Sequence, residues 1–170
     1  SACLVGSEMF IRDRFNHGVK EFPDQSRQRL RKKLGITNEP IVASHGLIHE
    51  HKGLLETLEA ISLLVKDYPA LKFLSINAVN KDNATSSATF TKMQEYIVAN
   101  KLEDNVLLVP EFLDKAEIVS LLHLADVLVL PYDDLNEGAS GAVRYCLSAN
   151  RPVIITNSSI FEELDNVGYR

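Results

Sequence analysis

Cysteine, proline, glycine and long apolar runs are all scarce in this sequence, and each shortage excludes a class of protein. With 8 Gly and 6 Pro among 170 residues, and with 45% hydrophobic residues, the chain is neither collagen-like nor disordered. No apolar run approaches the roughly 20 residues that a membrane-spanning helix requires. The two cysteines, Cys3 and Cys146, provide neither a disulfide framework nor a metal-ligand spacing. The composition therefore predicts a soluble globular domain that suits a reducing compartment.

Positive charge is also scarce. Lys and Arg number 18 against 23 Asp and Glu, which gives a net charge of −5. That sign opposes a domain that holds nucleic acid mainly through phosphate contacts. The segment from Ser1 lacks the basic start and the sustained apolar core of a signal peptide. We therefore expect a cytoplasmic protein.

Short apolar runs alternate with helical patterns along the chain, which is typical of repeated strand–helix units. Five of these runs are too short and too apolar for surface helices, and most are rich in β-branched residues or leucine. They predict buried strands at residues 41–45, 72–77, 106–109, 127–130 and 153–156. The sequence therefore predicts an α/β fold with a doubly wound parallel sheet, Rossmann-like in its organisation.

The segments between the strands carry apolar residues at helical spacing and predict amphipathic helices. The expected helices cover residues 53–66, a stretch after Thr85, a stretch after Asp114, and residues 140–149. Asp114 and Glu117, three residues apart, form a capping box that starts the third of these helices. Residues 81–87 are predicted to be a polar loop, and residues 160–164 a short helical segment.

A basic helix is predicted before the first strand, over residues 24–34, and is closed by Gly35 in a left-handed conformation. Its basic residues are Arg27, Arg29, Arg31, Lys32 and Lys33. We favour a solvated helix face over a partner-binding role, because runs of charged residues usually lie on a solvent-exposed face. Residues 1–38 are then the linker and leading helices of a single domain, and residues 39–170 are its α/β core.

The loops after the strands are the places where an open parallel sheet binds ligands. After the first strand, the segment SHGLIHEHKG places Gly46 at a tight turn and puts Lys52 and Gly53 at the start of a helix. Lys52, the free amide groups and the helix dipole would together hold a phosphate. On the spacing alone we favour the alternative, an ordinary solvated lysine, because the segment is not the G-x-x-x-x-G-K-[ST] phosphate loop.

The histidines raise the question of a metal site. His45, His49 and His51 lack the i, i+4 pairing of a helical zinc motif, and no cysteine lies near them. We therefore expect no metal. His123 falls in an apolar helix and is expected to be partly buried and hydrogen-bonded, whereas His17 is expected in a turn.

The segment after the fourth strand, PYDDLNEGASGAVRYC, is the most informative part of the chain. Glu137 supplies a carboxylate that can accept hydrogen bonds from sugar hydroxyls. Four small residues follow it and let the backbone approach a phosphate at the next helix: Gly138, Ala139, Ser140 and Gly141. Arg144 would add a phosphate or ribose contact, and its alternative is a surface ion pair with Asp133 or Asp134.

The order of these pieces resembles the group 1 (family 4) retaining glycosyltransferases, specifically the nucleotide-sugar-binding C-terminal half of their GT-B fold. The matching segments are HGV from His17, R-x-x-L-G from Arg31, G-x-x-x-x-x-K-G from Gly46, ADVLVLPY from Ala125, EGASGAVR from Glu137 and NRPVIIT from Asn150. Each segment is weak by itself, but their order and spacing together are specific. The SGAVR form resembles a bacterial subgroup of the family.

The resemblance implies a hexosyltransferase of polysaccharide biosynthesis that transfers a sugar, with retention, from a nucleoside diphosphate sugar to a glycan or lipid-linked acceptor. It implies that Lys52 holds the donor diphosphate, that Glu137 binds the transferred sugar, and that the amides of residues 138–141 receive sugar and phosphate oxygens. Neither a metal nor another cofactor is expected. The acceptor site would belong to an N-terminal domain outside this chain, so the isolated half would be inactive. The full protein could work at the inner face of the membrane.

Two positions differ from the family pattern. Leu47 stands where an arginine usually follows the first glycine, and Tyr145 stands where a second glutamate usually binds the ribose. These differences keep a second hypothesis open, that of a catalytically degenerate module that binds sugar nucleotides or a partner. A Rossmann oxidoreductase is disfavoured, because no G-x-G-x-x-G follows any predicted strand.

Overall fold

A five-stranded parallel sheet forms the centre of the computed structural model, which describes residues 24–133 and 141–161. The elements in chain order are α2 (Asp24–Lys33), β1 (Ile41–Leu47), the short 3-10 helix η1 (Glu50–Lys52), α3 (Leu54–Asp67), β2 (Lys72–Ala78), α4 (Ala84–Ala99), β3 (Val106–Leu108), α5 (Lys115–Leu122), β4 (Val127–Leu130), α6 (Gly141–Ser148) and β5 (Val153–Ile155). The strand order is β3-β2-β1-β4-β5, and all neighbouring pairs are parallel. The predicted doubly wound, Rossmann-like α/β fold is confirmed.

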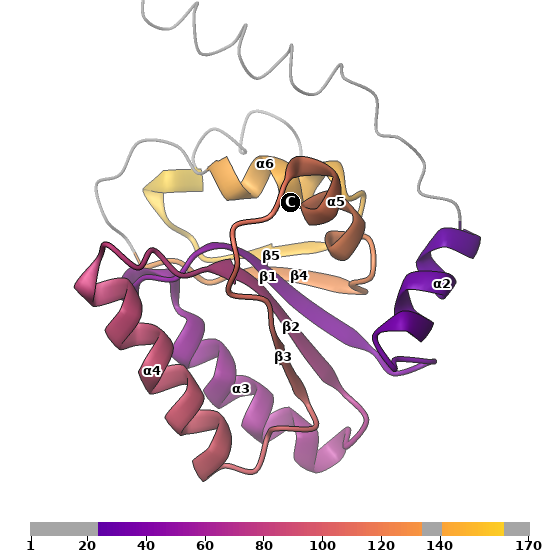
Figure 1. The fold of residues 1–170 in the computed structure, drawn as a ribbon, viewed down its shortest axis with the longest axis horizontal. Helices are drawn as coiled ribbons and strands as arrows, with labels where there is room; N and C mark the ends of the chain where they lie inside the picture. Colours follow the sequence, from indigo (N-terminus) through magenta and orange to yellow (C-terminus); the bar gives the residue numbers. More distant parts are fainter. Residues whose placement is uncertain (1–23, 134–140, 162–170) are drawn as a thin grey trace, which may run out of the picture.

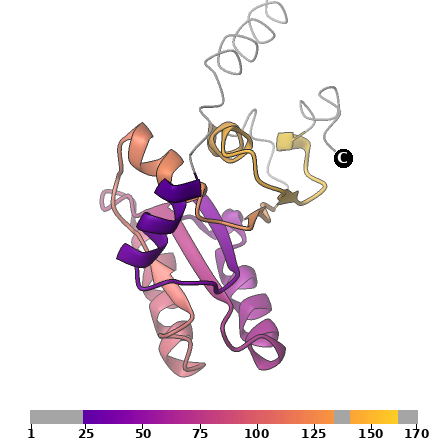
Figure 2. The same cartoon turned by 90° about the vertical axis from the view of Figure 1, so that its right-hand side faces the viewer.

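Helices cover both faces of the sheet, because parallel strands need crossover connections. Helices α3 and α4 lie on one face, and α5 and α6 lie on the other (Figures 1 and 2). Phe73, which is fully buried, packs toward α3 and α4, whereas its neighbour Leu74 packs in the other core, as alternation along a strand requires. The sheet therefore has two apolar cores, and its carboxyl edge stays available for a ligand.

The helix termini follow from local signals. The Asp114 carboxylate accepts a hydrogen bond from the Glu117 amide at 2.9 Å, and the Glu117 carboxylate accepts one from the Asp114 amide at 3.0 Å, so the predicted capping box is confirmed. The polar loop predicted at residues 81–87 is wrong in its second half. Helix α4 starts at Ala84 because the Asn83 side chain caps it by accepting a hydrogen bond from the Ser86 amide.

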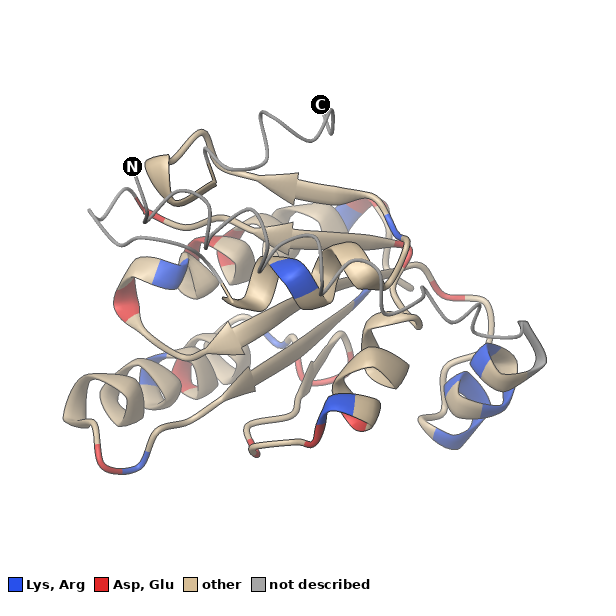
Figure 3. Ribbon diagram, turned by 90° about the horizontal axis from the view of Figure 1, so that it is seen from above, with Lys and Arg blue, Asp and Glu red and all other residues tan. Residues whose placement is uncertain are grey.

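Helix α2 carries the basic residues that the sequence analysis expected to be solvated (Figure 3). This expectation is wrong for two of them. The Arg27 guanidinium donates to the His123 carbonyl at 3.0 Å and to the Asp126 carboxylate at 2.6 Å. Arg31, only 6% exposed, donates to the Leu124 carbonyl at 3.2 Å, and its burial lowers its pKa. The carbonyls at the end of a helix have no partner within it, so these arginines attach α2 to the end of α5.

The described part of the chain holds no helix that is both long enough and apolar enough to cross a bilayer.

Candidate functional site

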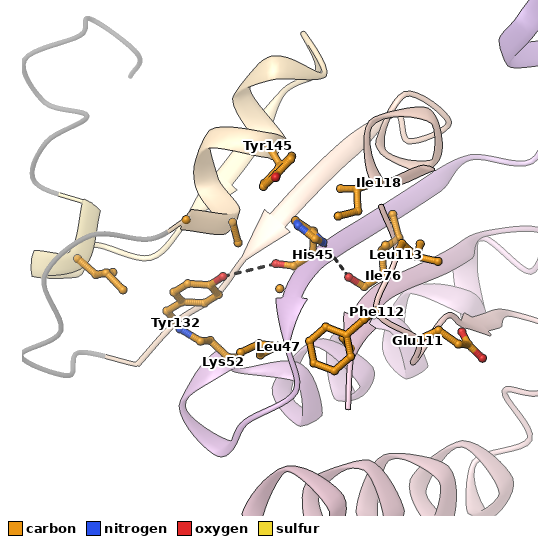
Figure 4. A pocket seen from close by; sticks show the side chains of 15 residues that line it. His45, Leu47, Lys52, Ile76, Glu111, Phe112, Leu113, Ile118, Tyr132 and Tyr145 are labelled. Atoms are coloured by element: carbon orange, nitrogen blue, oxygen red, sulfur yellow. Dashed lines mark hydrogen bonds between the residues drawn. The ribbon is translucent and has the colours of Figure 1, made fainter. Parts of the chain in front are cut away.

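The strand order places a crevice at the carboxyl ends of β1 and β4. Helix α3, which follows β1 and η1, lies on one face of the sheet. Helix α6, which follows β4, lies on the other face (Figure 1). Such a switch point is where open α/β sheets bind ligands. A pocket of about 350 Å³ lies there (Figure 4). Its lining comes from His45, Gly46, Leu47, Lys52, Ile76, Ala78, Glu111, Phe112, Leu113, Ile118, Tyr132, Gly141, Ala142, Tyr145 and Ile160.

Gly46 forms part of the pocket floor, and its conformation requires glycine. Its φ is +149°, and a Cβ there would stand 3.3 Å from the Tyr132 hydroxyl and 3.5 Å from the Ala142 Cβ. With its amide oxygen toward Gly46, the buried Asn77 side chain accepts from the Gly46 amide at 3.1 Å and donates to the Ser44 carbonyl at 3.2 Å. The backbone at the end of β1 is therefore fixed from the neighbouring strand.

Lys52 and Gly53 join η1 to α3 at the edge of the pocket. Gly53 has a φ of +62°, and a Cβ at this position would overlap the Pro131 carbonyl oxygen. The Lys52 Nζ lies 4.0 Å from the centroid of the Tyr132 ring, within the range of a cation–π contact. Lys52 is half-buried and lines the pocket. Its role in holding a phosphate stays a prediction.

His45 is a pocket residue that the sequence analysis considered only as a possible metal ligand. Its Nδ1 lies 3.0 Å from the Ile76 carbonyl oxygen, and its ring meets the Tyr145 ring edge-on with centroids 5.4 Å apart. Burial lowers the pKa of His45 and outweighs the bond to Ile76, which raises it. The imidazole is therefore neutral near pH 7.

The predicted site residues divide into three groups. Gly46, Lys52, Gly141 and Tyr145, which lie far apart in the sequence, all line the pocket. Arg144 is half-buried on α6 and is not a lining residue. The remaining four predicted residues, Glu137, Gly138, Ala139 and Ser140, lie outside the described residues, as does His17.

The other described histidines, His49, His51 and His123, do not gather into a metal cluster. The His49 and His51 rings lie 4.4 Å apart, but within residues 24–133 and 141–161 no three His, Cys, Asp or Glu side chains stand close enough to hold a metal. His123 is buried, as expected, at the C-terminal end of α5. Cys146 is a buried free thiol whose pKa burial raises to about 12, so it is not reactive.

Sequence reasoning missed one wall of the pocket. Residues 111–113, in the loop after β3, and Ile118 on α5 line it opposite Lys52 (Figure 4). The signal was available, because this loop also follows a parallel strand and the same edge-of-sheet rule applies to it. Tyr132 was also missed, although it directly follows the fourth strand and Pro131.

The structure thus combines a Rossmann-like parallel sheet with a switch-point pocket that Lys52 lines just before α3. The sequence matches the model of the family described as glycosyl transferases group 1 over residues 26–166. The chain therefore belongs to that family. A comparison with curated protein sequences finds no match.

Solved structures with the same fold include glycosyltransferases. A glycosyltransferase from Rickettsia africae has a TM-score of 0.71 at 18% identity, covering 91% of this chain and 38% of that one. The C-terminal domain of a group 1 glycosyl transferase from Francisella tularensis has a TM-score of 0.67 at 20% identity, covering 81% and 68%. HepE from Anabaena, in complex with UDP and glucose, has a TM-score of 0.71 at 15% identity, covering 84% and 36%. The chain thus spans little more than a third of the Rickettsia and Anabaena proteins.

Proposed function

We propose that this chain is the donor-binding domain of a glycosyltransferase and that it holds a nucleoside diphosphate sugar in the pocket between β1, α3 and α6. The full-length protein would transfer a hexose with retention to a glycan or lipid-linked acceptor, in bacterial polysaccharide biosynthesis. An N-terminal domain outside this chain would hold the acceptor, so the isolated chain would transfer nothing. The protein would act in the cytoplasm or at the inner face of the membrane.

One observation carries the proposal: Lys52, two residues before α3, borders a pocket at the switch point of a group 1 glycosyltransferase domain. An ammonium group beside a helix N-terminus favours an anion such as a diphosphate. As the bond to the transferred sugar breaks, negative charge grows on the departing diphosphate, and Lys52 would stabilise it electrostatically. Glu137 would bind hydroxyls of the transferred sugar. The structure of HepE with UDP and glucose, on the same fold, supports this choice of ligand.

Calorimetric titration of the chain with UDP, GDP, ADP and UDP-glucose tests the proposal. We expect weak binding of at least one nucleotide, unaffected by excess chelator because Lys52 and the helix dipole would carry the phosphate charge. Lys52→Ala should weaken both diphosphate and donor sugar about 10- to 100-fold, the value of a charge-assisted bond. Lys66→Ala, which replaces an exposed lysine in the last turn of α3, is the matched control and should bind normally. Binding that Lys52→Ala leaves intact would contradict the assignment.

Glu137→Ala separates the two assigned roles. Because Glu137 is assigned to the sugar, Glu137→Ala should bind UDP-glucose more weakly than the wild type does. Its affinity for UDP should be unchanged or slightly higher. A loss of UDP affinity as severe as that of Lys52→Ala would mean that this division of roles is wrong.

The second candidate is a module of the same fold that binds a sugar nucleotide without catalysing transfer. It is favoured by Leu47, a 47% exposed apolar residue at the pocket, and by Tyr145. Leu47 cannot neutralise phosphate charge as the arginine of the family pattern would, and Tyr145 cannot bind a ribose as the glutamate of that pattern would. A full-length protein that binds the donor but never consumes it would establish this alternative.

A further inference from the structure

The imidazole of His45 has a defined tautomer. Its Nδ1 lies 3.0 Å from the Ile76 carbonyl oxygen, which can only accept a hydrogen bond, so Nδ1 carries the proton. In the neutral ring, Nε2 then has a lone pair and no hydrogen. Among residues 24–133 and 141–161, no group donates a hydrogen bond to this atom.

The ring is also held in place. Tyr145 packs edge-on against it, with centroids 5.4 Å apart, and the next residue, Gly46, is fixed by the Asn77 amide. Both His45 and Tyr145 line the pocket (Figure 4). A fixed acceptor on the pocket wall can select a donor group on a ligand, because little ordering is needed on binding.

We propose that His45 is a ligand-binding residue whose Nε2 accepts a hydrogen bond from a hydroxyl of the bound nucleotide sugar, on the ribose or on the transferred sugar. This inference rests on the proposed function and adds a contact that none of the predicted site residues provides. A diphosphate offers only acceptor oxygens at neutral pH, so the Nε2 lone pair disfavours it. The phosphates therefore go to Lys52 and the start of α3, and a hydroxyl group goes to His45.

The position of Tyr145 supports this arrangement. A carboxylate at residue 145 would accept hydroxyl hydrogen bonds, whereas the phenol ring at this position packs against His45 instead. The neutral imidazole is an acceptor that this packing holds beside residue 145. Burial supports its neutrality by lowering the pKa of His45.

Two variants separate the two ring nitrogens. In His45→Asn, the shorter amide can still donate to the Ile76 carbonyl but has no atom at the Nε2 position. In His45→Gln, the longer amide can offer an acceptor oxygen near that position. We expect wild-type folding and about 3- to 10-fold weaker UDP or UDP-glucose binding for His45→Asn, the value of one neutral hydrogen bond. His45→Gln should recover part of the loss. His123→Gln, a histidine at the end of α5 and outside the pocket, is the matched control.

Ligand variants identify the hydroxyl. UDP, CDP, 2′-deoxy-UDP, 3′-deoxy-UDP and UDP-glucose are titrated into wild type and His45→Asn, and melting temperatures confirm that both proteins are folded. If a ribose hydroxyl donates to His45, removing that hydroxyl from the ligand lowers the affinity of the wild type but does not lower the affinity of His45→Asn any further. If the transferred sugar supplies the hydroxyl, His45→Asn weakens UDP-glucose and leaves UDP unchanged.

Equal binding of UDP and of UDP-glucose by wild type and His45→Asn would overturn the inference while leaving the proposed function intact. The inference would also be overturned if His45→Asn lost the same affinity for every UDP ligand but none for CDP. The partner of His45 would then be the N–H of the uracil base, which cytosine lacks. Absence of any nucleotide binding by the wild type would instead refute the proposed function itself.

Discussion

Replacing Gly53 with alanine should destabilise the protein more than any other glycine substitution in the described residues. Gly53 begins α3 in the left-handed region, with a φ of +62°. A Cβ built there overlaps the backbone carbonyl oxygen of Pro131, at the end of β4, and stands 3.0 Å from the Pro131 carbonyl carbon. A backbone atom cannot relieve this overlap by a change of rotamer. The start of α3 or the end of β4 must therefore move.

The expected cost has two parts. An alanine in the left-handed region costs about 1–2 kcal/mol. Forcing an extra methyl group into a packed contact costs about 1–3 kcal/mol more. Gly53→Ala should therefore lower the free energy of unfolding by about 2–5 kcal/mol, and each kcal/mol lowers the melting temperature of a domain of this size by roughly 2–4 °C.

Gly35→Ala is the matched control, because Gly35 has a φ of +72° and nothing within 4 Å of the added Cβ. It should lose only the backbone part, about 1–2 kcal/mol. Urea denaturation of wild type and both variants measures the difference. If Gly53→Ala costs no more than Gly35→Ala, the close approach of α3 to β4 is not a feature of the protein in solution, and the reasoning fails.

Two further predictions concern the arginines of α2 and the buried histidines. Arg27→Ala should lower the free energy of unfolding by about 1.5–3 kcal/mol, because its guanidinium bonds the end of α5 and the Asp126 carboxylate, whereas exposed Arg29→Ala should cost less than about 0.5 kcal/mol; equal losses in urea denaturation would refute the assignment. Burial lowers the pKa of both His45 and His123, so below about pH 6.5 the unfolded chain binds more protons and stability should fall as the pH falls. His45→Asn should reduce this dependence, and an unchanged pH profile would contradict the assignment.

The strands and helices were predictable because their signals are local. Apolar alternation and helical spacing are read within a dozen residues, and the Asp114 capping box lies within four. Errors occurred at the ends of elements, where a single side chain can decide at which residue a helix begins. Asn83 caps α4 and turned a predicted loop into helix.

The burial of Arg27 and Arg31 could not be predicted in the same way. Arg27 bonds the carbonyl of His123, which lies 96 residues further along the chain. A basic run looks the same whether it faces water or the end of a distant helix, since the difference lies in the partner. The solvated-face interpretation therefore holds for the exposed Arg29, Lys32 and Lys33 and is wrong for Arg27 and Arg31.

Part of the candidate site was predictable because the edge of a parallel sheet collects the residues that follow its strands. This rule brought Gly46, Lys52 and Tyr145 to one pocket. It could not give the orientation of His45, which depends on the Ile76 carbonyl of the neighbouring strand. Nor could it reveal that Tyr132 lies under Lys52, because that contact joins residues 80 positions apart.

The contact between Lys52 and Tyr132 bears on how a ligand would bind. An ammonium group over an aromatic ring gains about 0.5–1 kcal/mol at a partly exposed site, whereas a charge-assisted bond to a phosphate gains about 1.5–3 kcal/mol. A diphosphate would therefore displace the ring as the partner of Lys52. Meanwhile Gly53, packed on Pro131, keeps the backbone at the start of α3 in place. Tyr132, just after β4, thus contacts Lys52 beside the pocket, and we expect a bound diphosphate to replace this contact.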